Sequence, residues 1–198
     1  MIEIRSPLSS SVEPGEYGAQ SAAKAALQLS ERAPGSLIQI AGWQDFATVT
    51  APALGALGFD GHGNFRTVQT AGPVSCYRIA PDKLLLRHSD GGSFKELLEN
   101  LNPASSPTLD LSHARWLIEI EGSEVEALLA RLASLDFSLQ EFPEGTFAQT
   151  GIHHVGVLLH RVSADKFLIF VPVTWAESIW NLICETAAPF GFKVIVHP

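Results

Sequence analysis

The sequence predicts an α+β fold in which one strand–helix–strand–strand–strand–helix unit occurs twice. The two copies are expected to pack about a pseudo-twofold axis into one compact domain. The main observation is an internal repeat: three short segments, 37–42, 78–84 and 93–96, match 117–122, 161–167 and 174–177 in the same order and at nearly constant spacing. The second observation is that the strands come in hairpin pairs and the helices are few, which excludes a parallel doubly wound sheet.

Residues 1–33 are predicted to form an N-terminal arm and a short helix. Ser6-Pro7, three consecutive serines and Pro14-Gly15 are typical of an extended arm, which is expected to be either disordered or laid over a partner. The alanines and leucines of 21–33 suit a short helix.

Residues 34–101 are predicted to be the first repeat. Its first strand alternates apolar and polar side chains and stops at Gly42, where a sharp turn is possible. Asp82-Lys83 is a polar turn between two further strands, and Ser93 with Glu96 is the capping-box pattern of a helix start. The predicted elements are strands 37–42, 74–79 and 84–88, a helix after Gly42, helix 94–101 and a linker at 102–108.

Residues 109–198 are predicted to be the second repeat. Ser123 and Glu126 form a capping-box pattern ahead of apolar residues at helical spacing, and Thr174 with Glu177 repeats that pattern. The predicted elements are strand 117–122, a helix containing Val125, Leu128, Leu129 and Leu132, strands 154–162 and 167–172, helix 175–188 and a closing strand at 192–196.

Composition limits the classes of function. The formal net charge is −8 and the 13 lysines and arginines are scattered, which argues against nucleic-acid and membrane-surface binding. The N-terminus lacks a signal-peptide pattern and no apolar run is long enough to span a bilayer, so the chain is expected to be cytoplasmic. Cys76 and Cys184 are expected to be buried free thiols. A mean hydropathy of +0.16 hints that a partner covers some apolar surface.

We expect no catalytic, cofactor-binding or metal site in this chain. Asp110, Ser112 and His113 are too close along an extended segment to converge as a triad. His154 and His160 lie about 20 Å apart if both are on one strand, so these two cannot share a metal. His153 would need distant metal-binding partners, and the sequence identifies none. The glycine-rich segments 61–64 and 90–93 match no phosphate-binding motif and indicate turns.

Two of the four tryptophans are candidate interface residues. Trp175 and Trp180 are five residues apart on a predicted helix, which separates their side chains by about 140°. One of them is therefore expected to face outward and to anchor a partner chain, because aromatic residues are enriched in interface cores. Ordinary core packing is the alternative for each.

The second half carries a family resemblance. The segments that carry it are 110–115 (DLSHAR), 135–137 (LDF), 142–145 (FPEG), 157–161 (VLLHR), 170–180 (FVPVTWAESIW) and 187–191. Together they resemble the gamma subunits of heterotetrameric sarcosine oxidases, and Ser6-Pro7-Leu8 is similar to that family's N-terminal segment. More distantly, the duplicated plan resembles the folate-binding region of the glycine-cleavage T-protein (aminomethyltransferase) family. No segment matches the acidic folate motif of that family, and Asp136 and Glu141 are not assigned its role.

The resemblance implies a non-catalytic structural subunit, with alpha, beta and delta subunits as partners and the main contact with alpha. It implies that FAD, FMN, NAD and tetrahydrofolate are held by the partner subunits and none by this chain. The complex would demethylate sarcosine to glycine with O₂, giving H₂O₂ and methylenetetrahydrofolate. The alternatives are a stand-alone folate-binding, aminomethyltransferase-like protein and a scaffold subunit of an oxidase for another N-methyl amino acid.

Overall fold

The computed structural model describes residues 5–19 and 26–196, and its chain divides into two compact units. One unit contains Met1–Ala33 and Ala114–Pro198, and the other contains Pro34–His113. This division differs from the predicted single compact domain with a linker at 102–108. The chain passes from one unit to the other after Ala33 and after His113, so the N-terminal segment belongs with the second half of the sequence. In the described part of the chain, no helix is both long and apolar enough to cross a bilayer.

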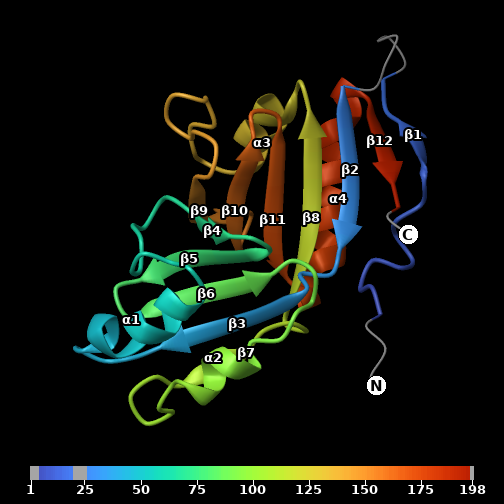
Figure 1. The fold of residues 1–198 in the computed structure, drawn as a ribbon. Coiled ribbons are helices and arrows are strands. Elements are labelled where there is room, and N and C mark those ends of the chain that lie inside the picture. The colour runs from blue at the N-terminus through green and yellow to red at the C-terminus, as the bar shows by residue number, and fades with distance from the viewer. Residues whose placement is uncertain (1–4, 20–25, 197–198) are drawn as a thin grey trace. The chain divides into compact units, whose positions relative to one another are not determined.

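The larger unit is built on a seven-stranded sheet with the order β1-β12-β2-β8-β11-β10-β9 (Figure 1). β12 and β2 are parallel, and every other neighbouring pair is antiparallel. The strands are β1 (Gly15–Tyr17), β2 (Leu27–Arg32), β8 (Arg115–Gly122), β9 (Phe147–Ile152), β10 (Val155–Ser163), β11 (Lys166–Pro172) and β12 (Phe192–Ile195).

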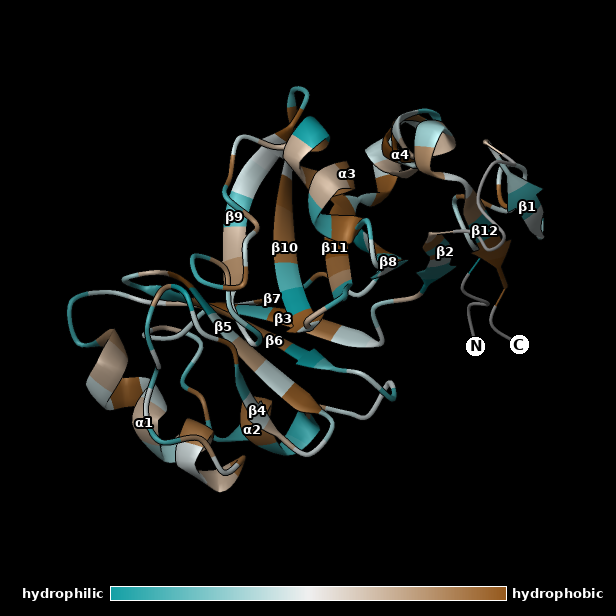
Figure 2. Cartoon of the chain, turned by 90° about the horizontal axis from the view of Figure 1, so that it is seen from above, coloured by the Kyte–Doolittle hydropathy of each residue, from teal (hydrophilic) through white to brown (hydrophobic). Residues whose placement is uncertain are grey.

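Two helices, α3 (Val125–Leu132) and α4 (Ala176–Ala187), cover one face of this sheet (Figure 2). Every second residue of the central strands faces them, because side chains alternate along a strand. The helices contribute an apolar stripe at helical spacing. Members of the resulting core include Trp116, Ile118, Ile120, Leu128, Phe167, Ile169, Val171, Ile179 and Ile183. The short helices η1 (Val173–Trp175) and η2 (Ala188–Phe190) flank α4.

The segment predicted as a short helix is a strand where the structure describes it. β2 occupies Leu27–Arg32, and residues 20–25 lie outside the described residues. Leu27 and Leu29 are both buried and are two residues apart, which is the strand period. β2 is held between β12 and β8, so pairing with segments far along the chain overrides the helix propensity of the alanines beside it.

The N-terminal arm lies on its own unit. β1 pairs with β12, and Leu8 is fully buried in the core of the larger unit. The hydroxyl of Ser6 and the indole Nε1 of Trp116 each donate a hydrogen bond of 2.5 Å to the Glu31 carboxylate. The prediction of a disordered or partner-bound arm is therefore corrected for residues 5–19.

The smaller unit holds a five-stranded antiparallel sheet with the order β4-β5-β6-β3-β7. Its strands are β3 (Ser36–Ala41), β4 (Gln69–Ala71), β5 (Val74–Ala80), β6 (Lys83–His88) and β7 (Thr108–Asp110). The helices α1 (Phe46–Ala56) and α2 (Lys95–Glu99) contribute Phe46, Leu54 and Leu97 to its core. Most of the predicted linker, residues 102–107, lies inside this unit ahead of β7.

The two units share the element order strand–helix–strand–strand–strand–helix, from β3 to α2 and from β8 to α4. The β5–β6 hairpin has a register shift after Arg78, and the β10–β11 hairpin has one after Arg161. The backbone N–H of Gly42 donates to Asp82, and that of Gly122 donates to Asp165 in the same way. The α+β fold class is therefore confirmed, while duplication about a pseudo-twofold axis stays a prediction.

The three predicted capping boxes do not form. α2, α3 and α4 begin two residues after the predicted caps, and none has a side-chain hydrogen bond from its N-cap residue. The Ser93 hydroxyl accepts a hydrogen bond of 3.1 Å from the backbone N–H of Lys95 instead of that of Glu96. Two of the acidic residues are used elsewhere: Glu126 pairs with Arg161 at 2.5 Å, and Glu177 accepts a hydrogen bond from Ser11 at 2.8 Å. For α3 and α4, long-range partners thus take the acidic side chain that the local capping box would use.

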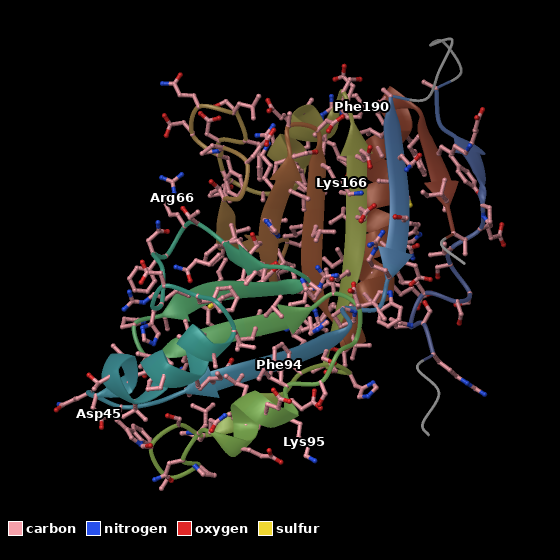
Figure 3. All side chains as sticks on the ribbon, in the orientation of Figure 1. Asp45, Arg66, Phe94, Lys95, Lys166 and Phe190 are labelled. Atoms are coloured by element: carbon pink, nitrogen blue, oxygen red, sulfur yellow. The ribbon has the colours of Figure 1, made fainter. Side chains whose placement is uncertain are left out.

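An ion-pair network joins three neighbouring strands of the larger sheet. Glu119 of β8 is 3 % exposed and pairs with Lys166 of β11 at 2.7 Å (Lys166 is labelled in Figure 3) and with Arg32 of β2 at 3.1 Å. Burial alone would lower the pKa of Lys166, but the hydrogen bonds and charges of Glu119 and Glu121 outweigh burial and raise it. The lysine is therefore held in its charged form, which compensates the buried carboxylate.

Candidate partner-binding site

A pocket of about 260 Å³ lies between the β9–β10 turn and the first turns of α4. Most of its lining side chains are apolar, and the two histidines of the turn and one serine are the polar ones. The lining residues are His153, His154, Val155, Trp175, Ser178, Ile179 and Leu182. An apolar concavity that carries a few polar groups is typical of a binding site.

Trp175 borders this pocket and is 51 % exposed. It precedes α4, and Ile179 and Leu182 follow it at intervals of four and three residues, so all three share one side of the helix. A large aromatic side chain beside an apolar pocket is the arrangement found at interface hot spots. The interface role of Trp175 stays a prediction.

Trp180 is a core residue. It is 1 % exposed and belongs to the core cluster that also contains Ala176, Ile183 and Ala187, on a different side of α4 from Trp175. The two tryptophans therefore face in different directions, as their spacing predicts. Its burial corrects the assignment of Trp180 as a candidate interface residue, because a partner chain cannot cover a ring that the core already covers.

The turn that carries His153 and His154 has a strained backbone. Ile152 pairs with Val155, so the two histidines form a two-residue hairpin turn. His153 has φ of 53°, and it is the one non-glycine residue with positive φ among residues 5–19 and 26–196. Hairpin turns of this length place glycine or asparagine at such a position. The two rings lie 6.1 Å apart at 76°, so the strained turn presents both imidazoles at the pocket.

The structure places the histidines 153, 154 and 160 in two different environments. His153 and His154 are exposed in the turn, whereas His160 is buried on β10 opposite Phe147 and Leu168. Within the described ranges, no group of three or more histidine, cysteine or acidic side chains is placed to hold a metal ion.

Asp110 and Ser112 have structural contacts at the edge of the smaller sheet, and His113 is exposed beside them. The Ser112 hydroxyl accepts a hydrogen bond of 2.9 Å from the backbone N–H of Leu37, which ties this segment to β3. The side-chain and backbone hydrogen bonds from Ser112 lower the pKa of Asp110. Ser112 therefore makes one local bond, from its backbone N–H to the Asp110 carboxylate at 2.8 Å, and one bond to a distant strand.

The glycine-rich segments are turns. Gly61 and Gly63 have positive φ, and between them His62 lies with Nε2 2.6 Å from the Thr50 hydroxyl. Burial and the nearby charge of Arg78 lower the pKa of His62. In the second segment a Cβ at Gly92 would lie 2.2 Å from the His88 ring, so the side chain of His88 requires glycine there.

The two arginines of the internal repeat, Arg78 and Arg161, hold neighbouring loops in place. From the sequence, their segments were evidence for the repeat only, and neither arginine was assigned a structural role. Arg161 is fully buried and donates to the carbonyl oxygens of Phe137 and Phe142 at 2.7 and 2.9 Å, and also to that of Ala164. Arg78 donates to the carbonyl oxygen of Gly63 at 3.2 Å and lies over the Phe65 ring. Each arginine thus holds the loop that leads into its hairpin. An arginine occurs four residues before each Asp-Lys turn, and this recurrence could have indicated a structural role for both arginines.

Both cysteines are free thiols. Burial raises the pKa of Cys76 to about 12, and burial followed by the charge of Glu185 raises the pKa of Cys184 to about 11. Both thiols are therefore protonated at neutral pH and poorly nucleophilic.

Asp136 and Glu141 lie in the loop between α3 and β9. Asp136 is exposed and accepts a hydrogen bond of 2.9 Å from the backbone N–H of Ser138, which lowers its pKa. Glu141 is exposed in the same loop, and its backbone N–H donates to Ser138. Their observed bonds shape the 134–146 loop.

The fold matches two solved structures. One is a chain of the heterotetrameric sarcosine oxidase from Corynebacterium sp. U-96, with a TM-score of 0.82 and 22 % identity over 94 % of this chain and 96 % of that chain. The other is the glycine cleavage system aminomethyltransferase T from Bartonella henselae, with a TM-score of 0.60 and 16 % identity. This chain spans 48 % of the length of that aminomethyltransferase. No family model and no characterised protein matches the sequence.

The protein is thus an α+β protein with the fold of a sarcosine oxidase chain, and it shares that fold more distantly with about half of an aminomethyltransferase. This outcome agrees with the resemblance found in segments 110–115 and 170–180.

Proposed function

We propose that this chain is the non-catalytic structural gamma subunit of a heterotetrameric sarcosine oxidase. The observation that carries the proposal is the fold match from end to end, which covers 94 % of this chain and 96 % of the oxidase chain. Because both shares are nearly complete, the matched chain is about as long as this one. The match is therefore to nearly all of a small chain of that oxidase rather than to one domain of a large chain.

In this proposal the chemistry belongs to the other subunits. The alpha, beta and delta subunits together hold FAD, FMN, NAD and tetrahydrofolate. The cytoplasmic complex consumes sarcosine and O₂ and forms glycine, H₂O₂ and methylenetetrahydrofolate. This chain supplies a scaffold surface to the alpha subunit.

Trp175 and the pocket beside it are the surface that we assign to the alpha subunit. The ring is half exposed, apolar residues line the neighbouring pocket, and the strained His153–His154 turn borders it. An interface buries apolar groups of this kind, and a central aromatic side chain commonly contributes more than its share of the binding free energy.

The test is purification of the tagged full chain with the other three subunits, followed by an absorbance spectrum and a peroxide assay. A yellow eluate that contains the larger subunits and releases peroxide on addition of sarcosine supports the proposal. Amine profiling of the same complex identifies its substrate, and a preference for another N-methyl amino acid would favour the scaffold of a related oxidase. A colourless eluate without partners would overturn the proposal.

Matched tryptophan variants test the surface. Trp175→Gln should weaken retention of the alpha subunit by about tenfold or more, since hot-spot aromatics contribute at least about 2 kcal/mol. Trp43→Gln is the control, because Trp43 is 64 % exposed but lies in the other unit. Equal retention by both variants would place the interface elsewhere.

The fold match to aminomethyltransferase T favours one alternative, a stand-alone folate-binding protein. Calorimetry of the purified chain with tetrahydrofolate tests it. Saturable binding in the absence of partner subunits supports this alternative, and the absence of heat on titration removes it.

A further inference from the structure

A second pocket, of about 230 Å³, lies between the N-terminal arm and α4 in the larger unit. It differs from the Trp175 pocket because its lining mixes aromatic rings with hydroxyl, amide and carboxylate groups. The lining residues are Ser10, Ser11, Glu13, Tyr17, Trp180, Asn181, Cys184, Phe192 and Val194.

Three aromatic rings form much of this pocket. Tyr17 of β1 stacks on Phe192 of β12 with ring centroids 5.3 Å apart, since the two residues are direct partners across the strands. The Tyr17 ring also covers Gly15, where an added Cβ would lie 3.1 to 3.2 Å from ring atoms. Glycine at this position thus lets the ring fold back, and Trp180 contributes the third ring from α4.

The charge at this pocket is negative. Glu13 is the one charged lining residue, and the Tyr17 hydroxyl fixes its backbone by donating to the Glu13 carbonyl at 2.9 Å. Ser11 donates to Glu177 at 2.8 Å, which places a second carboxylate against the lining. Burial is the main cause of the raised pKa of Cys184, and the charge of Glu185 adds to it. Lys193 follows Phe192 on β12, and its side chain projects to the opposite face of the strand.

Among the described residues that line this pocket, none is a lysine or an arginine. Aromatic rings beside carboxylates are the recognition chemistry of organic ammonium ions. We propose that this pocket binds a small organic cation, a primary or methylated ammonium compound, with its charged group between the Glu13 carboxylate and the exposed ring of Tyr17. Ser10 and Asn181 are placed to bond a hydroxyl or carbonyl on the same ligand. This inference is independent of the proposed oxidase function.

The test uses the 198-residue chain and a pair of ligands of the same shape. Choline is the cationic probe, and 3,3-dimethylbutan-1-ol is its neutral carbon analogue. Calorimetry measures binding, and the ¹⁵N–¹H signals of the tryptophan indoles locate it. We expect saturable binding of choline, little heat with the neutral analogue, and a shift of the Trp180 signal while that of Trp43 stays in place.

Two glutamates of the arm give matched variants. Glu13→Gln removes the lining carboxylate and should weaken choline binding about fivefold, the upper range for a solvent-exposed ion pair. Glu16→Gln is the control, because Glu16 is opposite Lys193 on the strand face that points away from Tyr17. Tyr17→Leu should weaken choline binding by about twofold to fivefold, through loss of the ring.

Three results would overturn the inference. They are equal binding of choline and its neutral analogue, a ligand-induced shift at Trp175 instead of Trp180, and equal effects of Glu13→Gln and Glu16→Gln. Absence of choline binding, with the unchanged spectrum of a folded chain, would overturn it as well.

Discussion

His153 adopts a backbone conformation that glycine adopts at lower cost. Its φ of 53° places it in the left-handed region, and a residue with a Cβ is destabilised there by about 1 kcal/mol or more. Its neighbour His154 and the pocket beside Trp175 share the same turn. A strained residue at the border of a pocket suggests that the side chain is retained for contact rather than for stability.

His153→Gly should therefore raise the stability of the free chain while it weakens the complex. We expect unfolding to require up to about 1 kcal/mol more, because glycine relieves the positive φ. Thermal unfolding of the free variant and retention of the partner subunits measure the two effects. A variant that is stabilised and still retains its partners normally would show that His153 contributes nothing to the interface.

His62 should make the stability of the smaller unit depend on pH. Its pKa is lowered in the folded chain, chiefly by burial and then by Arg78, so the unfolded chain binds a proton more readily. The stabilisation is present above the ordinary histidine pKa of 6.5, and it is lost as the pH falls through the pKa of the folded chain. The melting temperature should consequently fall between about pH 7 and pH 5.

His62→Gln should flatten this dependence. His113→Gln, at an exposed histidine of the same unit, should leave the dependence unchanged. Melting curves of the three proteins at both pH values measure the difference. Parallel curves for His62→Gln and the unmodified chain would assign the dependence to other groups.

At the scale of elements, the larger sheet is joined across β2, β8 and β11 by Glu119. Glu119→Gln would leave Lys166 and Arg32 facing a neutral amide. We expect a loss of about 2 kcal/mol in the free energy of unfolding, less than for a fully buried pair because both cations are partly exposed. Glu121→Gln, at a carboxylate that is 41 % exposed, should cost less than about 1 kcal/mol. Chemical denaturation measures both, and equal losses would contradict a special role for Glu119.

The elements also show where sequence patterns suffice. The sequence predicted the bounds of α3, α4 and the strands beside the two Asp-Lys turns within one or two residues. These elements were accessible because the spacing of their apolar residues is local to each segment. β2 was predicted as a helix because alanines precede it, and its pairing with β12 and β8 cannot be detected in a short window. The capping boxes failed because Glu126 and Glu177 bond to Arg161 and Ser11, which lie far away in the sequence.

At the scale of the whole molecule, the free chain should be poorly soluble. Its mean hydropathy is +0.16, and Trp175 exposes a large apolar surface beside an apolar pocket. Co-expression with the other subunits should raise its soluble yield, and Trp175→Gln should raise the yield of the chain expressed alone. Comparison of soluble fractions measures both. A free chain that is fully soluble and gains nothing from its partners would argue against the subunit role.

The candidate sites were accessible to prediction only in part. Helical spacing showed that Trp175 and Trp180 point apart, but it could not decide which of them faces solvent. The Trp175 pocket joins the 153–155 turn to α4, and the pocket at Glu13 joins the arm to α4 and β12. No sequence motif marks the lining residues of either pocket, because they lie far apart in the sequence and meet only after distant strands have paired.

By itself the sequence determined the α+β class, the helices and hairpins of both halves and the resemblance to the oxidase subunits. These depend on local periodicity, on turn residues and on short strings of letters. Only the tertiary structure decided that the arm and β2 join the second half of the chain, that Trp180 is buried and Trp175 exposed, and that two pockets form beside α4. Those outcomes depend on the pairing of β1 and β2 with β12, which lies near the other end of the chain. Local sequence patterns do not determine the free energy of such long-range contacts.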